Sequence, residues 1–270
     1  MINIQKPKAH FIDNQLLDPP NPVTVNLIGA GGTGSQVLIA LARMNQALTE
    51  LGHPGLWVRL WDRDVVTPAN FGRQLFAESE SGLYKSTALI NRTNRFFGTN
   101  WKAETSNFEK DILGGFDRNK QSIIYISCVD SVQSRFNISE ILNELKEFGG
   151  YYRSKGRYWI DFGNSQQSGQ VLLSTIGKIK QPDSEKFDTV ESLPFITDEF
   201  GDLLKISESQ DDTPSCSLAE ALERQDLYIN STLAQMGSSL LWSLFRNGFI
   251  ENKGFFLNLK TFQSQPIKVD

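Results

Sequence analysis

The chain has 270 residues, of which 39% are hydrophobic and 21% are charged, so it can bury one sizeable core and is typical of a soluble globular protein. A net charge of −4, without a clustered stripe of Lys and Arg, disfavours nucleic acid as a direct partner. The first residues lack the apolar core of a signal peptide and no apolar run is long enough to cross a bilayer, so we expect a cytoplasmic protein without membrane contact.

The first predicted elements form a β-α-β unit. Residues 1–22 are polar and end in a proline-rich run, which predicts an extended N-terminal arm. The apolar run at 23–28 predicts a strand that stops at a cluster of glycines, and apolar residues spaced by four and three over 37–51 predict a helix. Residues 56–61 predict a second strand, so the three elements together imply a parallel sheet.

The rest of the chain continues to alternate between helices and strands. Helices are predicted at 85–97, 131–148, 217–225 and 227–246, and strands at 102–105, 123–126, 158–162, 169–174 and 254–259. A polar, acidic stretch at about 177–216 shows little periodicity and predicts a long crossover loop. We therefore predict one α/β domain over 23–270, with a Rossmann-like, doubly wound, mostly parallel sheet and late antiparallel strands.

The glycine cluster after the first strand is a candidate phosphate site. Gly29, Gly31, Gly32 and Gly34 stand where a strand opens into a helix, and glycine lets backbone N–H groups come close to an anion near the positive end of that helix. The spacing fits the dinucleotide fingerprint of dehydrogenases. It fits other nucleotide-binding α/β proteins equally well, so the motif alone does not decide between them.

A second motif directly follows the second strand. Asp62 and Asp64 are followed by Asn70, Arg73 and Gln74, in the order D-x-D-x-V and then N-x-x-R-Q-x-x-F. Taken singly, Asp62 is read as a local cap and Arg73 as a surface ion pair. In this order the residues resemble the ThiF/MoeB/HesA family of adenylating enzymes, which are related to ubiquitin-activating enzymes. The resemblance implies that this segment binds ATP, with Asp62 on the ribose, Arg73 on the phosphates, and Asn70 and Gln74 supporting the nucleotide.

Further matches extend this resemblance over most of residues 20–262. Lys85 aligns with a family lysine that contacts the nucleotide phosphates, and Asp130 aligns with an aspartate that holds Mg²⁺. Asp130 also ends a predicted strand, where ligands of open α/β sheets bind, and its carboxylate suits Mg²⁺. From the residues alone, Asp130 is equally well read as the N-cap of the next helix.

The two cysteines have different predicted roles. Cys216, in the setting Pro214-Ser215-Cys216-Ser217, resembles the family cysteine that attacks an acyl-adenylate to form a thioester, although an inert buried thiol remains the alternative. Cys128 lies in an apolar strand and is expected in the core. Two cysteines and the isolated His10 and His53 do not make a zinc site, so no zinc is expected.

Taken together, the resemblance implies an enzyme that uses ATP and Mg²⁺ to adenylate a carboxylate, such as the C-terminal glycine of a ubiquitin-like or sulfur-carrier protein. A homodimer is implied as well, although no arginine precedes Arg43 to reach a partner's ATP site, and Lys6 or Lys8 is expected to replace it. The chain is similar to ThiF proteins of PRTRC plasmid-associated cassettes. The alternatives are a catalytically quiet nucleotide-binding or partner-docking protein of such a system and, more distantly, an NAD-dependent oxidoreductase.

Overall fold

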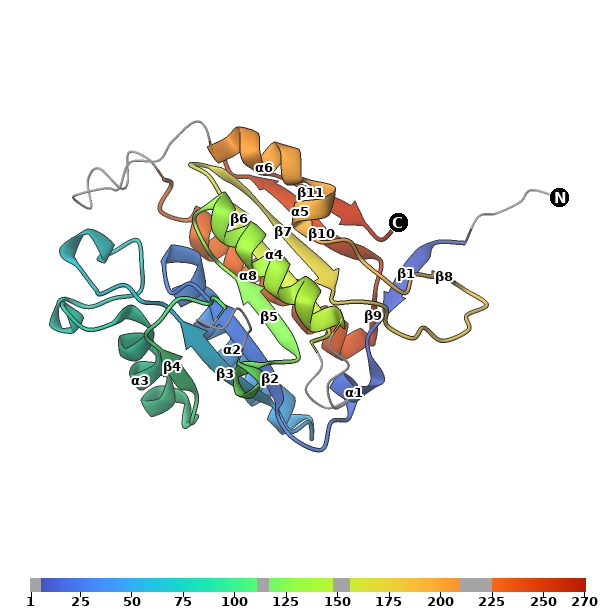
Figure 1. The fold of residues 1–270 in the computed structure, drawn as a ribbon, viewed down its shortest axis with the longest axis horizontal. Coiled ribbons are helices and arrows are strands. Elements are labelled where there is room, and N and C mark those ends of the chain that lie inside the picture. Colours follow the sequence, from blue (N-terminus) through green and yellow to red (C-terminus); the bar gives the residue numbers. More distant parts are fainter. Residues whose placement is uncertain (1–5, 111–116, 148–155, 209–224) are drawn as a thin grey trace.

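The fold is built on a central sheet of eight strands in a computed structural model that describes residues 6–110, 117–147, 156–208 and 225–270 (Figure 1). The strand order is β11-β10-β7-β6-β5-β2-β3-β4. The strands are β2 (Val23–Ile28), β3 (Leu56–Trp61), β4 (Lys102–Glu104), β5 (Ile124–Ser127), β6 (Tyr158–Asn164), β7 (Ser168–Thr175), β10 (Asn252–Asn258) and β11 (Gln263–Lys268).

Strands β4, β3, β2, β5 and β6 run parallel, and β7, β10 and β11 extend the sheet in antiparallel pairs. In the parallel part, Val25 pairs with Val58 on one side and with Ile124 on the other. These strands are nearly continuous apolar runs because both of their faces are covered. The predicted fold class, a mostly parallel doubly wound sheet with late antiparallel strands, is confirmed.

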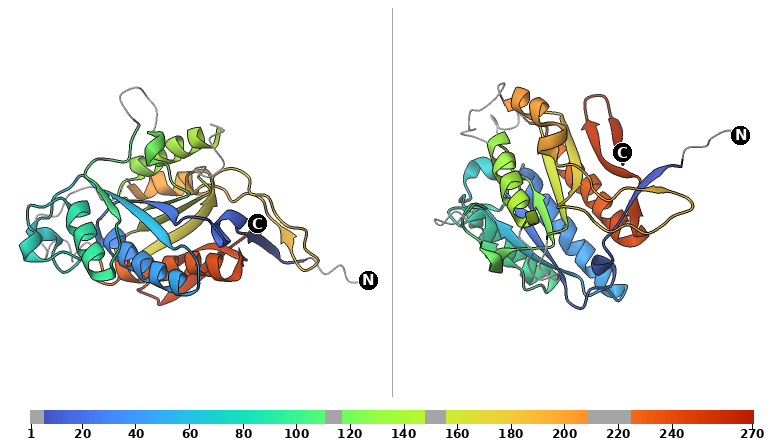
Figure 2. Two further views of the ribbon diagram at one scale, coloured as in Figure 1. Left: turned by 90° about the horizontal axis from the view of Figure 1, so that it is seen from below. Right: turned by 45° about the vertical axis from the view of Figure 1, so that its right-hand side comes forward.

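Helices cover both faces of the sheet (Figure 2). One face packs against α2 (Gly32–Glu50), α3 (Lys85–Phe97) and α8 (Ile229–Asn247), and the other carries α4 (Val132–Glu147), α5 (Ile196–Glu199) and α6 (Gly201–Glu208). Alternation along each strand sends neighbouring side chains to opposite cores. In β5, for example, Ile124 and Ile126 enter the core under α2 and α8, while Tyr125 enters the core under α4.

The order of the strands creates a crevice at one edge of the sheet. From β2 the chain moves outward through β3 and β4, and it then returns to place β5 on the other side of β2. The connections that leave the carboxyl ends of β2 and β5 therefore pass to opposite faces of the sheet. This switch point is where open α/β sheets bind ligands.

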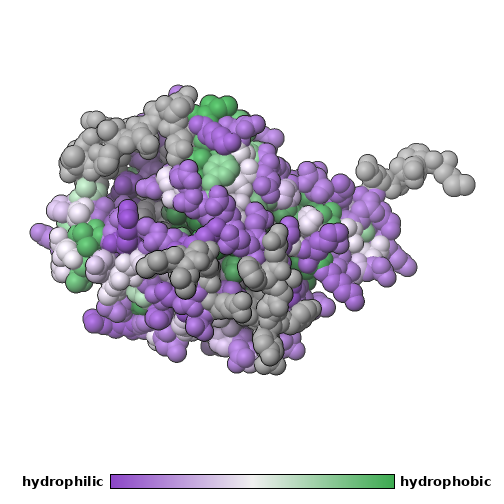
Figure 3. All heavy atoms as spheres, in the orientation of Figure 1, coloured by the Kyte–Doolittle hydropathy of each residue, from purple (hydrophilic) through white to green (hydrophobic). Residues whose placement is uncertain are grey.

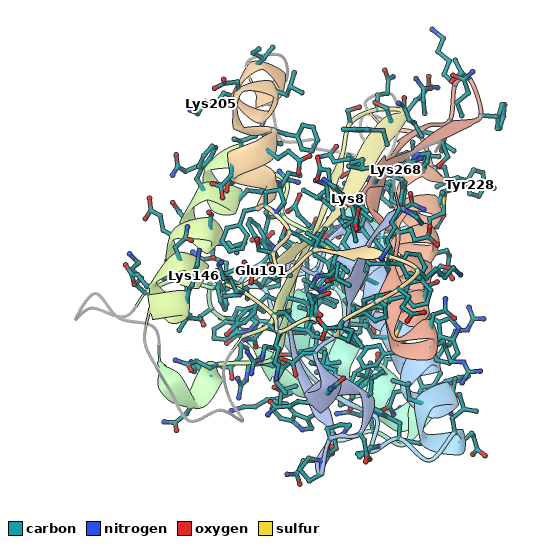
Figure 4. All side chains as sticks on the ribbon, turned by 90° about the vertical axis from the view of Figure 1, so that its right-hand side faces the viewer. Lys8, Lys146, Glu191, Lys205, Tyr228 and Lys268 are labelled. Atoms are coloured by element: carbon teal, nitrogen blue, oxygen red, sulfur yellow. The ribbon has the colours of Figure 1, made fainter. Side chains whose placement is uncertain are left out.

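The N-terminal segment forms more structure than its polar sequence indicates. Strand β1 (Lys8–Phe11) joins β8 (Asp188–Thr189) and β9 (Phe249–Ile250) in a small second sheet, and α1 (Asn14–Leu17) follows it. The buried His10 links this sheet to the large one, because its Nε2 lies 3.0 Å from the hydroxyl of Tyr158. Figure 4 shows Lys8 on this side of the molecule, near Lys268 of β11.

The segment expected to be a long crossover loop is partly folded. It contains β8, α5 and α6, and six of its described apolar side chains are buried, namely Ile179, Phe187, Leu193, Phe195, Ile196 and Leu204. These residues are spaced irregularly along the segment, so they show no helical or strand periodicity, and most of them pack in the two cores against residues distant in sequence. The helix predicted at 217–225 lies outside the described residues except for Gln225, which precedes α8.

The outer surface is mainly hydrophilic on the face shown in Figure 3, with an apolar patch over α6, where Leu203 and Ile206 are exposed. Strand β11 was not predicted, because its sequence is polar and contains Pro266. Among the described residues, no helix is both long and apolar enough to cross a membrane.

Candidate functional site

A pocket of about 500 Å³ opens at the carboxyl ends of β2, β3 and β5, which is the switch point of the sheet. Its lining comes from the turn after β2, the segments that follow β3, β4 and β5, the end of β6, the N-terminal parts of α3 and α4, and the residues at and just before the start of α8. The predicted residues that line it are Gly29, Gly31, Gly32, Asp62, Asp64, Arg73, Gln74, Lys85 and Asp130. Gly34 and Asn70 do not line it, and Cys216 lies outside the described residues.

The positions of the turn suit glycine for different structural reasons. Gly29 has φ +95°, and a Cβ there would lie 2.6 Å from the carbonyl oxygen of Cys128. At Gly34, a Cβ would lie 1.9 Å from the carbonyl oxygen of Gly29, so this glycine lets α2 pack directly on the turn. A Cβ at Gly31 would meet nothing within 4 Å, which leaves the N-terminus of α2 open toward the pocket.

Asp62 joins the end of β3 to the glycine turn. Its Oδ2 accepts from the backbone N–H of Ala30 at 2.6 Å, and its Oδ1 accepts from the N–H of Asp64 at 2.8 Å. Burial raises the pKa of Asp62, while these two hydrogen bonds and the charge of Lys85 oppose that shift. The carboxylate therefore anchors the turn and at the same time forms part of the pocket wall.

Lys85 brings a cation to the pocket from the first turn of α3. The residue is 8% exposed, and its Nζ lies 3.0 Å from Oδ2 of Asp64, whose side chain is 60% exposed. A pair with such an exposed partner contributes little to stability, about 0–1 kcal/mol. The ammonium is therefore held at the pocket by a carboxylate that an anionic ligand can displace at small cost.

Arg73 is a second cation in the lining. Its Nη1 donates to Oε1 of Gln225 at 2.6 Å. Burial lowers the pKa of the Arg73 guanidinium, and the charge of Asp130 acts in the opposite direction. Neither Arg73 Nε nor Gln74 Oε1 has a hydrogen-bond partner within the described part of the chain, although both atoms are buried.

Asn70 stabilises the loop that contains Arg73 and Gln74. Its Oδ1 accepts from the backbone N–H of Thr67 at 2.9 Å, and its carbonyl oxygen accepts from the N–H of Gln74 at 3.0 Å. The side chain is buried and does not reach the pocket. In the described structure, Asn70 thus shapes the loop that presents Arg73 and Gln74.

Asp130 is exposed at the pocket and does not cap the next helix. Ser131 caps α4 instead, because its Oγ accepts from the backbone N–H of Ser134 at 3.2 Å. The buried Arg135 fixes this loop from behind by donating to the carbonyl oxygens of Val129 at 2.8 Å and Ser131 at 3.3 Å. The carboxylate of Asp130 is therefore available to a ligand in the pocket, which Ser131, Ser134 and Asn137 also line.

The side chains available as metal ligands limit how a metal ion could be bound. No group of three or more His, Cys, Asp or Glu side chains that suits a metal occurs among the described residues. Mg²⁺ is commonly bound by one or two carboxylates together with phosphate oxygens and water, and the exposed Asp130 fits that mode. Among the described residues, Asp130 would thus hold Mg²⁺ only together with the phosphate oxygens of a bound ligand.

The chain is similar to known proteins over most of its length. The family model described as the ThiF family matches residues 10–267. The protein belongs to the ThiF family. Ubiquitin-like modifier-activating enzyme 5 of Drosophila willistoni is 30% identical over 133 residues, covering 45% of this chain and 30% of the relative. The same enzyme of Drosophila persimilis is 29% identical over 133 residues, covering 45% of this chain and 32% of the relative.

Solved structures share the fold of this ThiF-family chain. Escherichia coli MccB superposes with a TM-score of 0.57 at 16% identity, covering 94% of this chain and 63% of MccB. PaaA superposes with a TM-score of 0.54 at 16% identity, covering 92% of this chain and 64% of PaaA. The chain therefore spans about a third of the length of the curated relatives and less than two thirds of these solved proteins.

The pocket of this ThiF-family chain also has an apolar side that sequence reasoning missed. Trp61 and Phe108 meet edge to face with ring centroids 5.3 Å apart, and Ile28 and Ile138 complete the wall on the α4 side of the sheet. The glycine turn, Arg73 and Lys85 provide the polar side. Asp62, which also lines the pocket, directly follows Trp61 in the chain.

Other lining residues have only weak sequence signals. Asn230 and Gln225 reach the pocket from the start of α8 and from the segment before it, and Asn230 does not stand out in a helix in which about half of the residues are polar. Cys128, expected in the core, packs against the core but also lines the pocket. Burial raises the pKa of its thiol well above the ordinary value, which keeps the thiol protonated at neutral pH. Lys6 donates to the carbonyl oxygen of Ser184, and neither Lys6 nor Lys8 lines the pocket of its own chain.

Proposed function

We propose that this ThiF-family protein binds ATP in the pocket and adenylates a carboxylate of a small protein or peptide. The observation that carries the proposal is the convergence of Arg73, Lys85 and Asp130 on the glycine turn in one pocket. We assign the base to the apolar wall, the ribose hydroxyls to Asp62 and the phosphates to the cationic side of the pocket. A solved complex of MccB with ATP supports the nucleotide assignment.

The substrate assignment is supported by the relatives. The curated relatives are ubiquitin-like modifier-activating enzymes, and MccB has been solved with AMPCPP and MccA. We therefore propose a small polypeptide substrate, in particular the C-terminal glycine of a ubiquitin-like or sulfur-carrier protein. The sequence resemblance further supports a place among the ThiF proteins of PRTRC plasmid-associated cassettes, a cytoplasmic location, and a homodimer in which Lys6 or Lys8 approaches the partner's site.

In the proposed reaction, an oxygen of the substrate carboxylate attacks the α-phosphorus of ATP. The bond from that phosphorus to the bridging oxygen breaks, pyrophosphate leaves, and an acyl-adenylate remains. Arg73 and Lys85 stabilise the negative charge that develops on the phosphate oxygens, and the N–H groups of the glycine turn hold the nucleotide in place. Mg²⁺, held by Asp130 and phosphate oxygens, would supply further charge neutralisation.

A second step is proposed at Cys216. The thiolate would attack the carbonyl carbon of the acyl-adenylate, forming a thioester and releasing AMP. This role depends on the sequence resemblance alone. Replacing Cys216 by Ser is expected to abolish a thiol-sensitive adduct while adenylation continues. An adduct that persists in Cys216→Ser would show that another residue carries the acyl group.

The first step is tested by ATP–pyrophosphate exchange with purified candidate carrier proteins. We expect exchange in the wild type and a loss of at least about tenfold in Asp130→Ala. Exchange that survives unchanged in Asp130→Ala would overturn the assignment of Asp130. Calorimetry with ATP and NAD separates the alternatives: absence of binding to both favours a docking protein, and preferential binding of NAD favours an oxidoreductase.

A further inference from the structure

A network of side-chain amides connects the phosphate side of the pocket to α8. Gln225 Oε1 accepts two hydrogen bonds, from Arg73 Nη1 at 2.6 Å and from Asn230 Nδ2 at 3.0 Å. Asn230 Oδ1 also accepts two, from Thr33 Oγ1 at 2.8 Å and from Asn164 Nδ2 at 3.0 Å. The chain of contacts thus runs from the guanidinium, through two amides, to the first turn of α2 and the end of β6.

The direction of every bond in this network is determined by its chemistry. A guanidinium only donates, so the oxygen and not the nitrogen of the Gln225 amide must face Arg73. With that oxygen in place, Asn230 must present its nitrogen to Gln225 and its oxygen to Thr33. Reversing Gln225 would set its amide nitrogen against the guanidinium, and reversing Asn230 would set its oxygen against that of Gln225, so the network has one consistent arrangement.

Asn230 is held firmly as the centre of the network. It is 3% exposed, and it occupies the space beside Gly32, where a Cβ would lie 2.6 Å from Asn230 Nδ2. The backbone next to Gln225 is also fixed, because the N–H of Asp226 donates to the carbonyl oxygen of Gln166 at 2.8 Å. Gln225 is therefore held at both its side chain and its neighbouring backbone.

The choice of a neutral acceptor matters for Arg73. A carboxylate at this position would hold the guanidinium equally well, but it would cancel its charge and compete with an anionic ligand. An amide oxygen orients Arg73 and leaves its positive charge available to the pocket. Lys85, by contrast, is held by the carboxylate of Asp64, whose side chain is largely exposed to solvent.

We propose that Gln225, held in turn by Asn230, is a positioning residue that sets the guanidinium of Arg73 for the phosphates of the bound nucleotide. This assignment rests on the proposed binding of ATP. It predicts that the contribution of Gln225 to nucleotide binding acts entirely through Arg73. A residue that only stabilised the fold would instead change the binding of every ligand.

Calorimetry with ATP and with adenosine on the same variants tests the proposal. Gln225→Glu is expected to weaken ATP binding by about tenfold to a hundredfold, the scale of a charge-assisted hydrogen bond, and to change adenosine binding by less than about twofold. Gln225→Ala is expected to weaken ATP binding less, because the charge of Arg73 remains. Gln46→Glu, an exposed position on α2, makes the same charge change outside the pocket and is expected to leave both affinities unchanged.

A double-mutant cycle with Arg73→Ala distinguishes positioning from a general structural effect. In the Arg73→Ala background, Gln225→Ala is expected to cause no further loss of ATP affinity. An additional loss as large as in the wild-type background would overturn the inference, as would an equal loss for adenosine. If the wild type itself does not bind ATP, the proposed function fails. If it binds ATP and Gln225→Glu binds it equally well, only the role of Gln225 is refuted.

Discussion

Arg135 and Asp161 form an ion pair behind the pocket, with Arg135 Nε 3.0 Å from Asp161 Oδ2 and side chains only 6% and 1% exposed. The other carboxylate oxygen accepts from Ser127 Oγ at 2.6 Å, and the guanidinium also donates to the carbonyl oxygen of Phe162 at 3.1 Å. Because the guanidinium of Arg135 also donates to the carbonyl oxygens of Val129 and Ser131, on either side of Asp130, this pair ties the candidate site to the centre of the sheet.

Removing one member of this pair is expected to destabilise the fold strongly. Arg135→Ala would leave Asp161 buried without its partner, which costs about 3–5 kcal/mol of unfolding free energy. Urea unfolding measures the change. Lys178→Ala, which breaks an exposed pair with Glu191, serves as the control and is expected to cost at most about 1 kcal/mol. Equal effects of the two substitutions would contradict the role assigned to the buried pair.

His10 is expected to make stability depend on pH. Burial lowers the pKa of His10 below its ordinary value of 6.5, and the ring joins the carbonyl of Val190 to the hydroxyl of Tyr158. In the unfolded chain, His10 therefore binds a proton at higher pH than in the folded chain. Its contribution to stability is complete above about pH 6.5 and declines as the pH falls below that value.

The urea midpoint at pH 7.5 and at pH 5.5, in wild type and in His10→Gln, measures this contribution. We expect the decrease between the two pH values to be smaller in His10→Gln, because the imidazole no longer takes up a proton on unfolding. Equal decreases in both proteins would assign the pH dependence to other groups.

Two glycines of the turn are expected to respond differently to alanine. Gly34→Ala forces a Cβ against the carbonyl oxygen of Gly29, and overpacking against backbone is expected to cost about 3 kcal/mol or more of unfolding free energy. Gly31→Ala has room for its methyl group and is expected to change stability by less than about 1 kcal/mol, while weakening ATP binding at the open N-terminus of α2. Thermal unfolding and calorimetry measure the two effects, and a stable Gly34→Ala protein would show that the close contact can relax.

The ammonium of Lys85 is expected to contribute to phosphate binding. Lys85→Gln removes a nearly buried cation from the pocket, so ATP affinity is expected to fall about tenfold and adenosine affinity to stay unchanged. Lys102→Gln, at an exposed position on β4, is the control. Titration calorimetry at two salt concentrations measures the affinities of both variants for ATP and for adenosine. An ATP affinity that is equal in Lys85→Gln and wild type would remove this lysine from the site.

The order of the main elements was predictable from the sequence. Apolar runs such as 23–28 and helical spacing such as 37–51 are properties of a few neighbouring residues, and they correctly predicted β2, α2 and the alternation that implies a parallel sheet. The motifs after β2, β3 and β5 fell at the carboxyl ends of parallel strands, so their convergence followed from topology. The family resemblance pointed to the same residues.

Only the tertiary structure decided which other residues share the pocket. Gln225 meets Arg73 across 152 positions of the chain, and Asn230 reaches Gly32 because α8 packs against α2. No local pattern predicts such contacts. The same holds for β1, β8 and β9, which are short and form because they pair with one another. Local periodicity thus determined the main elements and the local order of residues determined the main site motifs, whereas long-range packing determined which side chains hold Arg73 and Asp130 in place.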